Sequence, residues 1–130
     1  MLFDTCVFID YFRSDNADAR RYVEDVITQK IPGYCSTITE VEMWSGVRNR
    51  REATALEILL SRFTTISVNS GIAKTTGGLL NRMSAAQRKS HFADALIAAT
   101  ALEIGQTVLT ADGRSQRVFG HRADYLVYHR

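Results

Sequence analysis

The sequence contains few of the residues that break or cross-link a chain. Its 130 residues include one Pro, eight Gly and two Cys, and no internal repeat or low-complexity tract occurs. So little Pro and Gly argues against long linkers and disorder. Two cysteines, Cys6 and Cys35, cannot form the disulfide framework of a small secreted domain, and we expect both to be free and buried. No apolar run approaches the roughly eighteen residues that a membrane helix requires, so no membrane span is predicted.

Zinc ligands and strong charge are missing as well. The three histidines, His91, His121 and His129, are scattered and have no neighbouring thiols, which excludes the usual zinc spacings. The net charge of +2 is compatible with a nucleic-acid partner but too small to predict one. Asp4 stands where a signal peptide would carry a basic segment and then an apolar run, so we expect a cytoplasmic protein.

What remains is the composition of an ordinary globular protein, with 45% hydrophobic and 23% charged residues. A chain of this length can bury a real core without cross-links, and we expect one domain over residues 1–130. Short apolar runs predict strands at residues 2–3, 34–35, 65–68, 107–109 and 126–128. Helices are predicted at residues 5–12, 15–30, 36–48, 51–63, 70–83 and 92–104.

End signals place several of these elements. Ser14 or Asp15 is expected to cap the second helix, and Asn69 or Ser70 the fifth. Gly105 is in the position expected of a C-terminal cap. Residues 84–90 are polar and predict a loop, and residues 112–113 predict an Asp-Gly turn. Because strands separated by helices need crossover connections, the sequence predicts a three-layer α/β/α fold with a short, mostly parallel central sheet.

Two acidic residues follow strands of this predicted sheet. Asp4 comes directly after the first strand and Asp112 lies just past the strand at residues 107–109, and each has a hydroxyl neighbour, Thr5 and Thr110. Either acid alone is better explained as a helix cap or a turn residue. Ligands of open parallel sheets bind beyond the C-terminal ends of the strands, so the two acids together favour a site.

Asp94 belongs to a helix face that should press against the sheet. The residues on its face, Ile97, Ala98 and Ala101, are small or apolar. An acid near a helix N-terminus can simply stabilise the helix dipole. That role does not explain an acid on the apolar face, where a carboxylate loses water and needs a cation or several donors.

Glu40 and Glu42 compete for a fourth position. Capping boxes can start at Thr37 or at Thr39, but one helix uses only one of them. If Thr37 is the cap, Glu40 completes the box and Glu42 is left free, with Gly46 leaving open space on the same face. The residue pattern alone does not choose between the two glutamates.

Several carboxylates in one pocket repel one another strongly unless a cation neutralises them. Ligands that are all oxygen select Mg²⁺, with Mn²⁺ as a substitute. Such an ion can activate water and stabilise the charge that develops on a phosphate, so the hydrolysis of phosphodiester bonds is the chemistry that suits these acids best.

Three segments, in order and spanning nearly the whole chain, resemble the motifs of PIN-domain ribonucleases of the VapC type, the toxins of toxin–antitoxin pairs. They are residues 1–10 (MLFDTCVFID), 36–47 (STITEVEMWSGV) and 94–112 (DALIAATALEIGQTVLTAD). The resemblance implies a PIN-like fold and a Mg²⁺-dependent endoribonuclease. It also selects Glu42 over Glu40. The implied catalytic and metal-binding residues are Asp4, Glu42, Asp94 and Asp112, supported by Thr5 and Thr110.

The resemblance further implies a homodimer and a cognate antitoxin that inserts a segment near the acidic pocket. Met43, Trp44 and Val47 are candidates for either contact, and core packing is the competing explanation for them. Two other functions stay open: a flap-type DNA nuclease, and a catalytically silent module that binds RNA or protein.

The chain departs from the family pattern after its last acid. Family members often have another acid followed by Phe at this point, whereas this chain has Arg114, Ser115, Gln116 and Arg117. The role of Asp112 is therefore the least secure of the four. The two arginines either contact phosphate or lie in a solvated loop.

Overall fold

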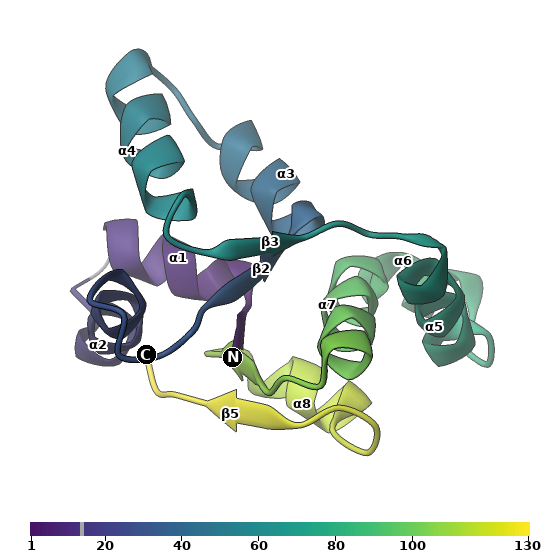
Figure 1. Ribbon diagram of the computed structural model, residues 1–130. Helices are drawn as coiled ribbons and strands as arrows, with labels where there is room; N and C mark the ends of the chain where they lie inside the picture. The colour runs from purple at the N-terminus through teal and green to yellow at the C-terminus, as the bar shows by residue number, and fades with distance from the viewer. Residues whose placement is uncertain (14) are drawn as a thin grey trace.

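The protein is described by a computed structural model that covers residues 1–13 and 15–130. Its core is a sheet of five short strands in the order β3-β2-β1-β4-β5, with every neighbouring pair parallel (Figure 1). The strands are β1 (Leu2–Phe3), β2 (Tyr34–Ser36), β3 (Thr64–Ile66), β4 (Val108–Thr110) and β5 (Tyr125–Val127).

Helices cover both faces of this sheet. They are α1 (Thr5–Arg13), α2 (Ala17–Ile27), α3 (Thr37–Ser45), α4 (Arg50–Leu60), α5 (Ser70–Leu80), α6 (Ala85–Ser90), α7 (Phe92–Ile104) and α8 (Gly113–Phe119). Side chains of α1, α2 and α4 pack with one face of the sheet, and those of α7 with the other, where α5 and α8 pack against α7 in turn. Figure 1 shows the sheet between these two groups. The predicted three-layer α/β/α fold is confirmed.

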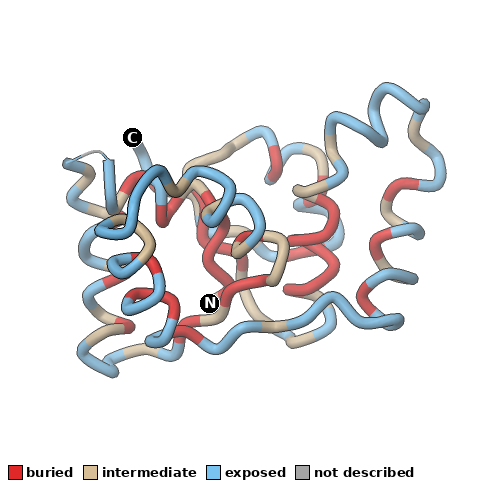
Figure 2. The backbone as a smooth tube through the Cα atoms, turned by 90° about the horizontal axis from the view of Figure 1, so that it is seen from above, coloured by how far each residue is buried: buried red, intermediate tan, exposed pale blue. Residues whose placement is uncertain are grey.

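The central strand β1 explains how two cores form on one sheet. Its two side chains point to opposite faces, as consecutive residues of a strand must. Phe3 joins the cluster under α1, α2 and α4, whereas Leu2 joins the one under α7. Phe3 also contacts the rings of Phe8 and Phe63, at centroid distances of 6.0 and 5.0 Å. Full burial of such a side chain stabilises the fold by about 1.5–3 kcal/mol, and buried residues are concentrated in the middle of the molecule (Figure 2).

Two elements differ from the prediction. Residues 84–90 were expected to be a loop, but α6 begins there behind a capping box in which Ser84 and Gln87 satisfy each other's backbone amides. The expected Asp112-Gly113 turn is instead the start of α8, and the Asp112 carboxylate caps that helix by accepting from the Arg114 amide.

The predicted helix ends are partly right. Asn69 caps α5, and Gly105 closes α7 in the left-handed conformation, at φ 65°. The cap of α2 was wrong: it is Asn16 rather than Asp15, and the alternative, Ser14, lies outside the described residues. No helix in the described ranges has the length and hydrophobicity needed to cross a membrane. Cys6 and Cys35 are both free; Cys35 is fully buried as expected, whereas Cys6 is only partly buried.

Candidate active site

Asp4 and Asp112 come together because β1 and β4 are neighbours. Phe3 pairs with Leu109, and the Asp4 amide donates to the Leu109 carbonyl at 2.9 Å. Both acids therefore lie at the C-terminal edge of the sheet, one just after each central strand. This is the edge at which open parallel sheets bind ligands.

Two threonines hold the Asp4 carboxylate. Its Oδ1 accepts from the Thr5 amide and its Oδ2 from the Thr110 hydroxyl, both at 2.8 Å. The same Thr110 hydroxyl accepts from the Asp112 amide at 2.9 Å. A single side chain at the end of β4 thus links two of the predicted acids.

The third acid, Glu42, reaches the site from α3. Its Oε1 accepts from the Thr5 hydroxyl at 2.7 Å, and that hydroxyl also lies 3.0 Å from Thr39 Oγ1. Thr39 is fully buried. Thr5 is therefore the link between Asp4, through its amide, and Glu42, through its hydroxyl.

Neither of the predicted capping boxes forms. Helix α3 is capped by Ser36, one residue before Thr37, and the Ser36 hydroxyl accepts from the Ile38 amide at 3.2 Å. Glu40 lies on the side of Cys35, where its charge adds to the effect of burial in raising the pKa of that thiol to about 11. The structure thus brings Glu42, and not Glu40, to the edge that carries Asp4.

Asp94 and Asp112 share a serine. Asp94 lies in the first turn of α7, and Ser115, almost fully buried, lies in α8. The Ser115 hydroxyl donates to Asp112 Oδ2 at 3.1 Å, and the Arg114 amide donates to Asp112 Oδ1 at 2.9 Å. Ser115 also opposes the rise in the Asp94 pKa through a hydrogen bond.

The four acids act on one another electrostatically. Asp4 is 8% exposed, and burial raises its pKa to about 6, with the charges of Asp94 and Glu42 adding to the rise and the Thr110 hydrogen bond opposing it. Burial also raises the pKa of Asp94, and the charge of Asp112 adds to that rise. Burial and mutual repulsion both disfavour the ionised carboxylates, as expected of a site that a cation would neutralise.

The donor set fits a hard divalent cation chemically, because all four side chains offer carboxylate oxygens. Within residues 1–13 and 15–130, however, no group of three or more His, Cys, Asp or Glu side chains is arranged to hold a metal ion. A cation would have to draw the carboxylates closer together.

Cys6 lies beside these acids without being one of the predicted site residues. Its Sγ is 3.3 Å from Thr110 Oγ1 and accepts from the Ala111 amide at 3.3 Å. Burial, and then the charge of Asp4, raise its pKa to about 11. Cys6 is therefore a neutral thiol that fills space rather than a nucleophile.

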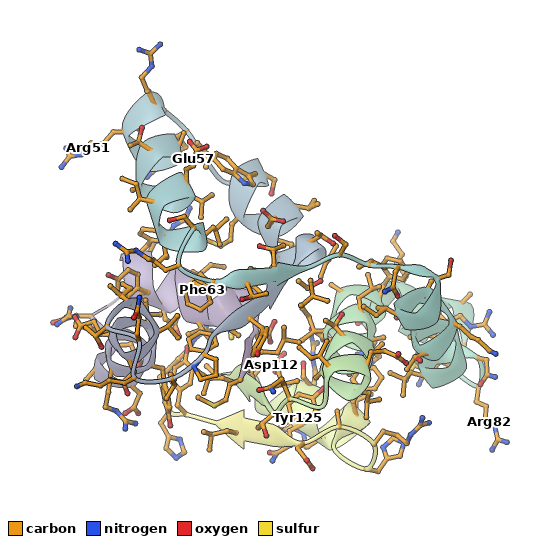
Figure 3. The ribbon with its side chains drawn as sticks, viewed as in Figure 1. Arg51, Glu57, Phe63, Arg82, Asp112 and Tyr125 are labelled. Atoms are coloured by element: carbon orange, nitrogen blue, oxygen red, sulfur yellow. The ribbon has the colours of Figure 1, made fainter. Side chains whose placement is uncertain are left out.

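Sequence reasoning missed several neighbours of the site. Thr39 lies 3.0 Å from the Thr5 hydroxyl, and Ser115 donates to Asp112. The spacing of Asp112 and Ser115, cap and third helical position, would have pointed to Ser115 had α8 been predicted. Two buried side-chain atoms of the described residues, His91 Nδ1 and Tyr125 Oη, have no hydrogen-bond partner. Figure 3 labels Tyr125 and Asp112, which lie in the same region of the molecule.

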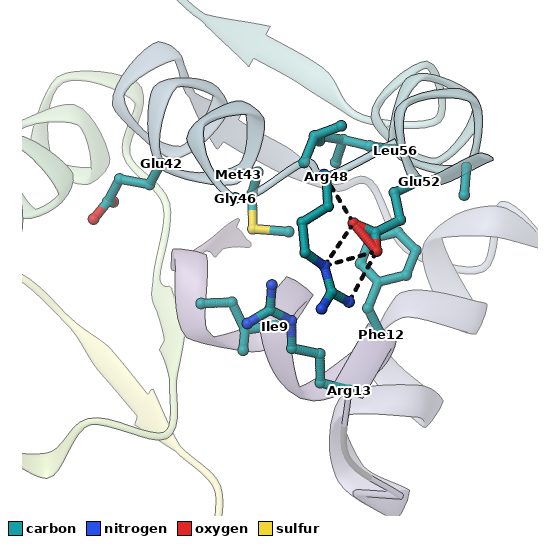
Figure 4. Close-up of a pocket in the computed structure, with 11 residues that line it drawn as sticks. Ile9, Phe12, Arg13, Glu42, Met43, Gly46, Arg48, Glu52 and Leu56 are labelled. Atoms are coloured by element: carbon teal, nitrogen blue, oxygen red, sulfur yellow. Dashed lines mark hydrogen bonds and ion pairs between the residues drawn. The ribbon is translucent and has the colours of Figure 1, made fainter. Parts of the chain in front are cut away.

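A partly apolar pocket of about 300 Å³ opens next to Glu42, between α1, α3 and α4. Its lining includes Met43 and Val47, which also pack against the core; core packing is therefore confirmed for both, and a contact with a partner stays a prediction. Figure 4 shows Glu42 at one end of the pocket and the Arg48–Glu52 ion pair, with a nitrogen–oxygen distance of 3.0 Å, at the other. Trp44 is 40% exposed and is not part of the lining.

This chain is similar to known proteins both in its sequence and in its fold. Residues 1–120 match the model of the PIN domain. Ribonuclease VapC19 of Mycobacterium tuberculosis is 31% identical over 118 residues, which cover 91% of this chain and 93% of that protein.

Two solved structures resemble the whole chain. VapBC2 from Rickettsia felis, bound to a DNA fragment from its promoter, matches with a TM-score of 0.74 at 15% identity, covering 98% of this chain and 97% of the other. A toxin–antitoxin complex from Klebsiella pneumoniae matches with a TM-score of 0.71 at 24% identity, covering 99% and 98%. With a family model that spans almost the full length and a relative this similar, the chain belongs to the PIN-domain family and to its VapC type.

Proposed function

We propose that the protein is a metal-dependent endoribonuclease that acts as the toxin of a toxin–antitoxin pair in the cytoplasm. The observation that carries this proposal is the set of four acids at one sheet edge, two of them held by Thr5 and Thr110. The relative named as a ribonuclease supports the choice of RNA as the substrate.

Each acid has a separate role in this proposal. Asp4, which is buried, and Asp94, which is partly buried, both have raised pKa values and would be the principal ligands of Mg²⁺, for which Mn²⁺ can substitute. Glu42 and Asp112 would complete the shell and orient the attacking water. A bound divalent ion would supply the positive charge that stabilises the phosphate during hydrolysis.

The arginines that replace the family's usual acid would bind the substrate. Arg114 and Arg117 are exposed on α8, and the charge of Arg114 already lowers the pKa of Asp94. A guanidinium this close to the acids is well placed to contact an RNA phosphate beside the scissile one.

Asp94→Asn tests the activity. The variant should lose RNA cleavage by more than about 100-fold, because it removes one of the principal ligands, and its expression should no longer arrest growth. The fold should survive, since the change removes a partly buried charge. Asp124→Asn, which alters an exposed acid just before β5, is the matched control and should cleave like wild type.

Cleavage by Asp94→Asn at the wild-type rate would refute this mechanism. Parallel digestion of single-stranded RNA and flap DNA separates the proposal from a flap-type nuclease. Calorimetry that detects no Mn²⁺ binding to the wild type would favour the silent binding module.

The pocket between α1, α3 and α4 is the proposed site of the antitoxin. Its walls are partly apolar, with Ile9, Phe12 and Leu56 among them, and Arg13 and Arg48 lie at its rim. These features suit an amphipathic segment of the antitoxin, whose apolar side chains would contact the walls and whose acidic side chains would contact the arginines. The segment would end next to Glu42. The structures of related toxin–antitoxin complexes support such a partner.

Ala55→Arg tests this surface. Ala55 lines the pocket and is exposed, so a bulky side chain should block the antitoxin without disturbing the core. Thr54→Arg, the exposed neighbour outside the lining, is the control. Calorimetry with the antitoxin encoded beside the toxin should show loss of binding for Ala55→Arg alone, with RNA cleavage retained by both. Equal binding by both variants would refute this location.

We also propose a homodimer. Val41, Val68 and Phe92 line an apolar hollow of about 440 Å³ between α3, α5 and α7, and Phe92 is 53% exposed. A second copy would cover this surface. Sedimentation velocity should show a dimer for the wild type and a monomer for Phe92→Glu. A monomeric wild type would refute the dimer, and a dimeric variant would refute this contact surface.

A further inference from the structure

The hydroxyl of Tyr125 is buried but makes no hydrogen bond within the described residues. A buried hydroxyl without a partner is unfavourable, and native structures retain few of them. The position of the Tyr125 hydroxyl suggests why it is buried without a partner.

Tyr125 lies next to α7, the helix that carries Asp94. It begins β5 opposite Val108 and packs against two clusters of buried residues, one of which contains Ala98 and the other Ala101, both on α7. Ala98 lies one turn after Asp94 on the same face of that helix. The small side chains leave room for the ring, and the order Ala101, Ala98, Asp94 leads from the core to the acids.

Electrostatic interactions agree with this placement. Burial raises the pKa of the Tyr125 phenol, and the charges of Asp4, Asp94 and Asp112 raise it further. The hydroxyl is therefore protonated and can donate a hydrogen bond to a carboxylate.

Of these three carboxylates, Asp94 accepts the fewest hydrogen bonds from the described residues. Both oxygens of Asp4 accept hydrogen bonds, from Thr5 and Thr110. Both oxygens of Asp112 also accept, from the Arg114 amide and the Ser115 hydroxyl. Within the described residues, the one hydrogen bond that Asp94 accepts comes from that same serine hydroxyl, and its other interactions are with the charges of nearby residues.

We propose that Tyr125 is a positioning residue of the acidic site, whose hydroxyl donates a hydrogen bond to the Asp94 carboxylate when a divalent cation is bound. This inference rests on the proposed function. Asp94 and Asp4 would hold such a cation, and a hydrogen bond from the phenol would fix the orientation of the Asp94 carboxylate. Partners of this kind typically change metal affinity by about 10–100-fold.

Tyr125→Phe tests the inference, because it keeps the ring and removes only the hydroxyl. Tyr34→Phe is the matched control: Tyr34 pairs with Leu2 in the same row of the sheet and packs in the same cluster. Without divalent ions, Tyr125→Phe should unfold within about 2 °C of the wild type, since it loses no hydrogen bond. Its Mn²⁺ affinity by calorimetry should fall about tenfold, and extra Mn²⁺ should restore part of its RNA cleavage. Tyr34→Phe should bind Mn²⁺ as the wild type does.

Two results would overturn the inference while leaving the proposed function intact. One is wild-type Mn²⁺ affinity and cleavage in Tyr125→Phe. The other is an equal further loss of Mn²⁺ affinity when Tyr125→Phe is added to Asp94→Asn, because the hydroxyl would then act independently of that carboxylate. A wild-type protein that neither binds Mn²⁺ nor cleaves RNA would instead refute the proposed function.

Discussion

Asp4→Asn should make the metal-free protein more stable, although it removes one of the proposed metal ligands. The Asp4 carboxylate is almost fully buried, and its pKa is raised from 3.8 to about 6. Each pKa unit corresponds to about 1.4 kcal/mol, so the ionised form is disfavoured in the folded state by about 3 kcal/mol. Asn resembles the protonated acid and avoids this cost.

The pH dependence follows from the direction of the shift. Because the folded state binds the proton more tightly than the unfolded state, the favourable contribution of Asp4 is complete below pH 4. It is lost as the pH rises through about 6. Asp4→Asn should therefore match the wild type near pH 4 and exceed its free energy of unfolding by up to about 3 kcal/mol at pH 7.5. The Thr5 amide can still donate to Asn, and the Thr110 hydroxyl can turn to accept from it.

Urea unfolding in EDTA, followed by circular dichroism at both pH values, measures this difference. The exposed variant Asp124→Asn should show no such pH-dependent gain. Adding Mg²⁺ should stabilise only the wild type, by about 2.7 kcal/mol at one hundred times the dissociation constant. A variant that is less stable than the wild type at pH 7.5, or that differs from it equally at both pH values, would refute the reasoning.

Three further predictions, one of them with a control substitution, concern other parts of the structure. Glu42→Gln should lower RNA cleavage about 100-fold, whereas Glu40→Gln should not, and a gel assay with equal effects would contradict this choice of site. Tyr128→Phe removes the hydroxyl that donates to buried Asp10 at 2.7 Å, and should lower the free energy of urea unfolding by about 2 kcal/mol; no loss would show that the bond is dispensable. Gly105→Ala meets no atom within 4 Å but must adopt φ 65°, so thermal unfolding should reveal a loss of about 1 kcal/mol, and an unchanged midpoint would argue against that conformation.

The sheet could be predicted from the sequence because its strands are short apolar runs between helices. The two missed helices, α6 and α8, have no apolar periodicity that would reveal them. The capping spacing of Ser84 and Gln87 was nevertheless readable, and it outweighs the polar character of the segment that follows. At α8, the Asp112-Gly113 pair is typical of a turn, and only the contacts of Asp112 with Arg114 and Ser115 show that it begins a helix.

The acids of the site could be located only in part. Asp4 and Asp112 follow strands, so the rule for sheet edges applies to them directly. For Glu42, the residue pattern left Glu40 as an alternative, and only the family resemblance selected Glu42. In the structure, Glu42 is joined to the site by the hydroxyl of Thr5, 37 residues away in the sequence, and its helix is capped by Ser36, which neither predicted box included. No local pattern encodes such contacts between distant elements.

The residues of α8 show how this chain tolerates its acids without the usual family pattern. Where family members often have a further acid and Phe, Ser115 provides a hydroxyl to Asp112 and Asp94, and Arg114 provides a positive charge that lowers the pKa of Asp94. Both changes offset repulsion among the carboxylates. The pKa values of Asp94 and Asp4 nevertheless both remain raised, that of Asp4 despite its two donors. Burial is the largest cause at both acids, so a bound cation would relieve a cost that the hydrogen bonds of the protein leave in place.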